Sequence, residues 1–183
     1  DFTVTPGGSL TDSDNLTVGG LATIVAAGHS VTLGDGTTAN FGSVDFAGDA
    51  VTITENSSMV IAASEATGAL SITANGAITQ TTGVIDADGT SSFSAGANAI
   101  TLDSANDFTG AVSLSNTGAN DVSITDSSAL ILGTVTVGQN LTITTGGALT
   151  DSGNVSVASL ATIVATGQNV TLGDATSETT NFG

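Results

Sequence analysis

Two short stretches place carboxylates two residues apart beside a turn residue: Asp12-Ser13-Asp14-Asn15 and Asp86-Ala87-Asp88-Gly89. Calcium loops often begin this way, because Ca²⁺ prefers several closely spaced oxygen ligands. Neither stretch continues to an acidic residue at the twelfth position of an EF-hand loop, and the GGxGxD nonapeptide is absent. The candidate calcium ligands are therefore Asp12, Asp14, Asp86 and Asp88, with solvated turn carboxylates as the alternative. We expect that no cofactor is required and that calcium is an optional ligand.

The same carboxylate pairs invite comparison with enzymes that cleave polysaccharides, in which two acidic side chains serve as acid and base. Such sites also need cationic or aromatic groups that hold the sugar. The chain has no Lys, Arg, Trp or Tyr. We therefore expect no catalytic residues and no enzymatic activity.

His29 is the single histidine of the chain, and it lies just before a short apolar motif. Without a second histidine, a metal or catalytic role has little support. Polar residues fill the same place before other copies of that motif, and in the best-matching copy Gln168 replaces His29. The sequence predicts a polar corner at these positions, namely His29, Asp49, Asn98, Asn120, Gln139 and Gln168.

The motif itself is an apolar residue, a Thr or Ser, and a second apolar residue. Because side chains alternate between the two faces of a strand, the outer residues point one way and the hydroxyl the other. The pattern predicts one short strand that is used repeatedly, with an apolar inner face. The eight copies are Phe2-Thr3-Val4, Val31-Thr32-Leu33, Val51-Thr52-Ile53, Leu70-Ser71-Ile72, Ile100-Thr101-Leu102, Val122-Ser123-Ile124, Leu141-Thr142-Ile143 and Val170-Thr171-Leu172.

Outward hydroxyls could form a flat threonine ladder of the kind that binds ice, although threonine also simply suits an exposed strand face. The six phenylalanines are expected to stack in the core rather than to form a ligand platform. The ladder candidates are Thr3/Thr5, Thr52/Thr54, Thr134/Thr136 and Thr142/Thr144, and the phenylalanines are Phe2, Phe41, Phe46, Phe93, Phe108 and Phe182.

The chain contains a long internal repeat. Residues 7–35 match residues 146–174 at 20 of 29 positions without a gap, so the repeat is about 140 residues long, with one copy at 1–139 and the start of the next at 140–183. A fainter half-repeat of about 70 residues relates Thr3–Thr11 to Ser71–Thr79. Successive motifs are separated by short steps of about 20 residues or by long steps of about 30 residues. We expect one continuous solenoid over 1–183, with three turns of about 20 to 24 residues per half-repeat.

Composition excludes several classes of partner. All 17 charged residues are acidic, so the chain cannot neutralise phosphates, and both nucleic acid and anionic membrane surfaces are excluded. Hydrophobic residues make up 39% of the chain, enough for a sizeable core. We find no cysteine, no transmembrane segment and no signal peptide. The chain lacks an initiator Met, and we expect it to be an excerpt of a longer protein.

Runs such as NAITLDSANDFTGAVSLSN (98–116) and NDVSITDSSALILGTVTVGQNLTITTGGALTDSG (120–153) resemble the β-strand repeats of giant bacterial surface proteins of the filamentous-haemagglutinin type. The resemblance covers essentially the whole chain and carries no catalytic motif. It implies a right-handed parallel β-helix in an extracellular rod or fibre. The alternative fold is a tandem array of β-sandwiches, but these need seven or more strands per domain of about 100 residues, whereas the motif here recurs far more often.

We therefore expect an all-β, right-handed parallel β-helix that forms a structural segment of a secreted or surface-displayed bacterial fibre, stalk or adhesin. Its expected partners are neighbouring repeats of the same chain, or identical chains joined end to end or laterally. The alternative functions are an adhesive module that contacts a glycan or another surface, and a calcium-stabilised or ice-binding solenoid.

Overall fold

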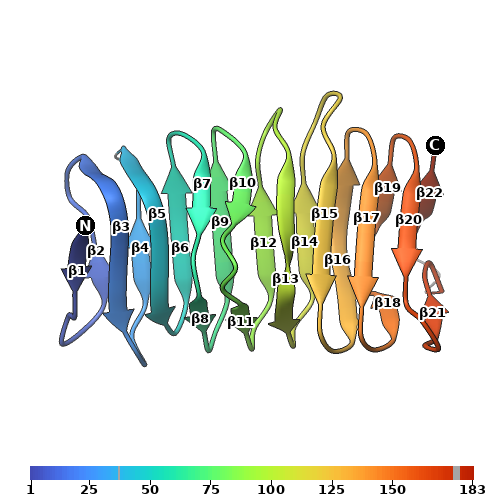
Figure 1. Ribbon diagram of the computed structural model, residues 1–183, viewed down its shortest axis with the longest axis horizontal. Helices are drawn as coiled ribbons and strands as arrows, with labels where there is room; N and C mark the ends of the chain where they lie inside the picture. The colour runs from blue at the N-terminus through green and yellow to red at the C-terminus, as the bar shows by residue number, and fades with distance from the viewer. Residues whose placement is uncertain (37, 175–177) are drawn as a thin grey trace.

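Short parallel strands wind into a β-solenoid of about eight turns in the computed structural model, which describes residues 1–36, 38–174 and 178–183 (Figure 1). The all-β solenoid predicted from the motif spacing is confirmed. Every strand pairing among the described residues is parallel, so the alternative of tandem β-sandwiches, which are built from antiparallel sheets, is wrong. No helix occurs among the described residues, and nothing in that part of the chain is a helix long and apolar enough to cross a membrane.

The described part of the chain has 22 strands; most are short, and only a few run through a corner of the coil. Their bounds are β1 Phe2–Val4, β2 Leu10–Thr11, β3 Leu16–Ala26, β4 Val31–Leu33, β5 Ala39–Gly48, β6 Val51–Glu55, β7 Met59–Ile61, β8 Ser64–Ala66, β9 Leu70–Ala74, β10 Ile78–Gln80, β11 Ile85–Ala87, β12 Ser91–Ser94, β13 Ile100–Phe108, β14 Val112–Ser115, β15 Val122–Asp126, β16 Leu130–Val137, β17 Leu141–Thr145, β18 Leu149–Asp151, β19 Val155–Val157, β20 Ala161–Val164, β21 Val170–Thr171 and β22 Thr180–Phe182.

Three stacks of strand segments run along the solenoid, because β3, β5, β13 and β16 each turn a corner and contribute a segment to two stacks. The first stack is β3 (16–18), β5 (39–41), β7, β10, β13 (100–102), β15, β17 and β20. The second stack is β2, β4, β6, β9, β12, β14, β16 (135–137), β19 and β22. The third stack is β1, β3 (22–26), β5 (44–48), β8, β11, β13 (106–108), β16 (130–132), β18 and β21. In Figure 1, β15, β17 and β20 of the first stack point down, whereas β6, β12 and β16 of the second point up. Each turn of the coil contributes one strand segment to each of the three stacks.

Alternation along each strand separates the core from the surface. In β6 and β17 the outer residues of the motif are buried and the central threonine is exposed, as the motif predicts. A stack of such strands buries one apolar side chain above the next, and each fully buried one contributes about 1.5 to 3 kcal/mol. Because a single turn has neither neighbour, the core depends on stacking rather than on any one turn.

The two step lengths between motifs have a simple geometric origin. Motifs that are one short step apart, such as those at Val51 and Leu70, are partners in adjacent turns of one stack. Motifs that are one long step apart, such as those at Leu70 and Ile100, lie in different stacks, because the chain has made one and a third turns between them.

The half-repeat spans three and a third turns instead of the three that we expected. With the two parts of β3, β5, β13 and β16 counted separately, β1 to β8 and β9 to β16 each supply ten strand segments, and three segments make one turn. Related strands such as β1 and β9 therefore fall in different stacks. Counting motifs along the sequence misses the extra third of a turn, because a motif does not show which stack it enters.

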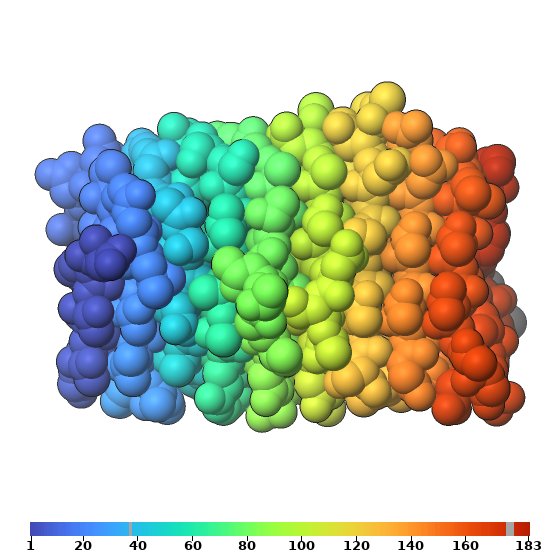
Figure 2. Space-filling view, in the orientation of Figure 1, coloured from blue at the N-terminus to red at the C-terminus, as the bar shows by residue number. Residues whose placement is uncertain are grey.

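The two ends of the solenoid differ from its middle. Phe41, Phe46, Phe93 and Phe108 lie in the core, as predicted, and the rings of Phe93 and Phe108 meet edge to face with centroids 5.9 Å apart. Phe2 and Phe182 are exposed because they belong to the first and last turns, so the prediction that all six are core residues is wrong for these two. Figure 2 shows the successive turns as bands from one end to the other.

Candidate functional site

Asp12 holds a corner of the coil. Both of its carboxylate oxygens accept the backbone N–H of Gly34 in the next turn, at 3.0 and 3.1 Å. Asp14 is exposed and accepts the N–H of the adjacent Asn15 at 2.8 Å. The predicted calcium ligands thus both accept backbone N–H groups, Asp12 from the next turn and Asp14 from its neighbour in the chain.

The second copy of the repeat reproduces this corner. Asp151 accepts the N–H of Gly173 at 2.9 and 3.0 Å, as Asp12 accepts that of Gly34. A backbone clamp is therefore the shared role of the aspartate in both copies.

Asp86 lies in the middle of a row of like charges. It is the central residue of β11, where it points outward between its register partners Glu65 in β8 and Asp107 in β13. Burial raises the pKa of Asp86 above its ordinary value, and the charges of Asp107 and Asp88 add to this effect. Asp88 is exposed in the bend directly after β11. The other predicted pair, Asp86 and Asp88, thus belongs to an acidic strip on the outside of the coil.

A cluster of three acidic residues lies close to the C-terminal turn. The carboxylate oxygens of Asp151, Asp174 and Glu178 all fall within 4.8 Å of one another, the one such group of three found among the described residues. Hard divalent cations favour oxygen donors of this kind. The sequence analysis did not select these residues, because Asp151 is a full turn away from the other two in the chain. The one available signal was that Asp12 and Asp35 recur as Asp151 and Asp174.

Two acidic residues are buried inside the coil. The Glu55 carboxylate accepts the N–H of Phe41 at 3.1 and 3.2 Å and the hydroxyl of Ser57 at 2.8 Å. Asp126 accepts the N–H of Phe108 at 2.8 Å and that of Ser128 at 2.7 Å. Burial raises the pKa of both carboxyls, and the hydrogen bonds offset part of that increase.

Almost all other buried polar side chains have partners. Asn106, for example, accepts the N–H of Ile85 at 2.9 Å and donates to the carbonyl oxygens of Leu102 and Thr125. Among the described residues, the hydroxyl of Ser91 is the one buried side-chain polar atom without a hydrogen-bond partner. The interior thus has very few free hydrogen-bonding groups that could bind a ligand.

Hydroxyl side chains form two ladders on two of the three stacks. The second stack carries six in register, Thr11, Thr32, Thr52, Ser71, Ser92 and Ser113. The first stack carries five, Thr79, Thr101, Ser123, Thr142 and Thr162. The candidates for a single threonine array are divided, since Thr52 and Thr142 lie in different stacks.

His29 lies exposed in a tight turn after β3. Its N–H donates to the carbonyl oxygen of Ala26 at 2.8 Å, and Gly28 between them has a φ of 73°. Gln168 makes the matching contact with Ala165 at 3.0 Å. The geometry is that of a polar corner, and it is built equally well with glutamine.

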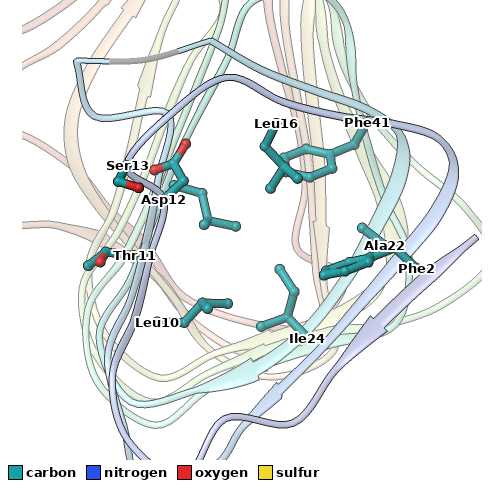
Figure 3. Close-up of a pocket in the computed structure, with 10 residues that line it drawn as sticks. Phe2, Leu10, Thr11, Asp12, Ser13, Leu16, Ala22, Ile24 and Phe41 are labelled. Carbon is teal, nitrogen blue, oxygen red and sulfur yellow. The ribbon is translucent and has the colours of Figure 1, made fainter.

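A cavity of about 270 Å³ opens at the N-terminal turn (Figure 3). Its walls are largely apolar, and Figure 3 shows Leu10, Leu16 and Ile24 directed into the space inside the coil, with Thr11 and Ser13 directed away from it. The cavity is thus the open end of the core, with the Asp12 clamp at its edge.

A family described as repeats of unknown function (DUF5649) matches nearly the whole chain, at residues 1–47, 48–115 and 119–182. Comparisons with curated proteins and with solved structures gave no match.

Proposed function

The chain belongs to the DUF5649 family of repeats of unknown function, and we propose that this structural repeat protein is a segment of an extracellular or cell-surface fibre, stalk or adhesin. Its task in this proposal is to project or build a filament. It performs no catalysis and requires no cofactor.

The observation that carries the proposal is the parallel pairing along all three stacks, from β3 to β20, from β2 to β22 and from β1 to β21. Each turn adds about 4.8 Å to the length of the coil. About eight turns therefore form a segment close to 40 Å long, whose length is set by the number of turns. Adding further turns of the same kind lengthens the solenoid without requiring a new fold.

Surface chemistry supports a location outside the cell. The chain has no Lys or Arg, so it offers no site to proteases of trypsin specificity, and its 17 acidic residues keep copies apart by repulsion. The exposed strand faces carry mainly hydroxyl and carboxylate groups, which are compatible with water on every side.

An antibody raised against the folded 183-residue chain tests the location. We expect it to label intact cells of the source organism and to show extended structures at their surface by immunogold electron microscopy. Labelling that appears only after the envelope is permeabilised would refute the proposal. Antibodies to a known surface protein and to a cytosolic protein serve as the two controls.

A further inference from the structure

The apolar face formed by β20, β21 and β22 at the C-terminal end is exposed, and we propose that it binds a further β-coil with the inward pattern of residues 43–56. The required pattern is Val-x-Phe followed by Val-x-Ile, as at Val44, Phe46, Val51 and Ile53. This inference rests on the proposed structural role and specifies the partner of one end of the segment.

The internal repeat shows what covers this face. Residues Ala161–Val164 repeat Ala22-Thr23-Ile24-Val25 without a change, and Val170-Thr171-Leu172 repeat Val31-Thr32-Leu33. In the first copy these residues have a neighbour on the C-terminal side: Ala22 and Ile24 are in register with Val44 and Phe46. The strand at Val31 is in register with Val51–Ile53 in the same way.

The C-terminal copy has the same backbone register on its other side. Leu149 donates its N–H to the carbonyl oxygen of Asn169 at 2.9 Å, as Leu10 does to that of Ser30 at the same distance. The two copies are thus built alike up to this face.

Identical residues differ in exposure between the copies. Val31 is fully buried and Val170 is 47% exposed, whereas Phe41 is 6% exposed and its counterpart Phe182 is 43% exposed. Leu160, next to β20, is 62% exposed. Since the sequences and the preceding contacts agree, the difference comes from the turn that covers the first copy.

Buried polar chemistry adds a further requirement. In the first copy Glu55 receives the N–H of Phe41, and Phe182 is the counterpart of Phe41. A matching coil therefore supplies a carboxylate at its position 55 as well as the four apolar side chains.

The N-terminal turn of a second copy does not meet this description. That turn repeats residues 140–157, which in this structure come before β20 and not after it. A head-to-tail contact would place Phe2 where Val44 belongs.

The test appends residues 43–115 directly after Gly183, the counterpart of Gly42. We expect hydrogen exchange of the amides between residues 161 and 171 to slow by about tenfold or more relative to the original chain. A second readout compares Ile163→Ala with Ile24→Ala. In the original chain Ile163→Ala lowers the melting temperature less, and in the extended chain the two variants lower it equally.

The control carries Val51→Asp and Ile53→Asp in the appended segment only, which keeps its length while removing the apolar pattern. The inference would be overturned if the amides between residues 161 and 171 exchanged equally fast in the original and extended chains. It would also be overturned if the control segment slowed their exchange as much as the unchanged segment does, or if filaments of the original chain alone gave the same protection. None of these results affects the antibody labelling of intact cells, so the proposed function is tested independently of this inference.

Discussion

The backbone N–H of Phe41 points into the carboxylate of Glu55, and one half-repeat later the N–H of Phe108 meets Asp126 in the same way. The two pairs occupy related places in the half-repeat and lie in different stacks of the coil. Each phenylalanine is a core side chain whose backbone donor finds an acceptor inside the protein. A buried carboxylate without a cation is therefore a repeated element of this architecture.

This arrangement predicts that the protein becomes more stable at mildly acidic pH. The pKa values of Asp45, Glu55, Asp86 and Asp126 are all raised, chiefly by burial. A raised pKa means that the folded state binds protons more tightly than the unfolded state, so stability increases as the pH falls through the folded pKa toward the ordinary value. We expect the midpoint of urea unfolding to rise between pH 7 and about pH 4.5.

The contribution of the buried pair is isolated by the double variant Glu55→Gln, Asp126→Asn, in which the increase should be smaller. Salt at about 0.5 M provides a second comparison, because it screens surface repulsion much more than it affects buried groups. A midpoint that falls steadily on acidification would contradict the prediction.

Asp126→Ala should destabilise the fold by about 2 kcal/mol or more. The substitution leaves the N–H groups of Phe108 and Ser128 without their acceptor, and a buried donor without a partner costs about 1 to 3 kcal/mol. Chemical denaturation measures the change. Asp103→Ala is the matched control, since Asp103 is exposed, and it should alter stability by less than about 0.5 kcal/mol. Equal effects of the two variants would show that Asp126 acts through charge alone.

The two faces of one motif should respond very differently. Ile143 is fully buried between turns, so Ile143→Ala is expected to cost about 2 to 5 kcal/mol through lost burial and a residual cavity. Thr142 points outward, and Thr142→Ala should change stability by less than about 1 kcal/mol. Thermal unfolding followed by circular dichroism compares the variants. Similar losses for both would contradict the inward and outward assignment.

A column of glycines allows the turns to stack closely at one corner. A β-carbon added at Gly89 would lie 2.4 Å from the carbonyl oxygen of Gly68, and one at Gly110 would lie 2.3 Å from that of Gly89. Gly89→Ala should therefore lower the melting temperature by several degrees, because backbone must move to admit the methyl group. Gly7→Ala is the control, since no atom lies within 4 Å of its added β-carbon. A Gly89→Ala protein as stable as Gly7→Ala would exclude this steric constraint.

Calcium should stabilise the C-terminal turn modestly. Asp151, Asp174 and Glu178 bring three carboxylates together in a chain that has no Lys or Arg to neutralise them. We expect millimolar Ca²⁺ to raise the melting temperature, by mass action, more than sodium chloride of equal ionic strength does. Asp174→Asn should remove most of that increase while leaving the contact of Asp151 with Gly173 intact. An equal calcium effect in both proteins would assign it to general surface charge.

The spacing of residues along the sequence predicted the candidate site residues only in part. The Asp12-Ser13-Asp14 spacing correctly marked a corner, but it did not reveal that Asp12 clamps Gly34 in the next turn. The acidic groups of the structure arise between turns, as in Glu65, Asp86 and Asp107, where each neighbour is a full turn away in the chain. Sequence proximity carries no information about such contacts unless the turn length and the stack are known.

The sequence by itself determined the elements: the alternation of apolar and hydroxyl residues requires short strands with one buried face, and their recurrence requires stacking. It also determined the absence of cationic chemistry. Tertiary structure alone decided which stack each strand enters, because the extra third of a turn in each half-repeat is set by how the coil closes around its core. That choice places related motifs in different stacks and separates Thr52 from Thr142. Tertiary structure also decided that Val31 is buried while the identical Val170 is exposed, because a following turn covers Val31.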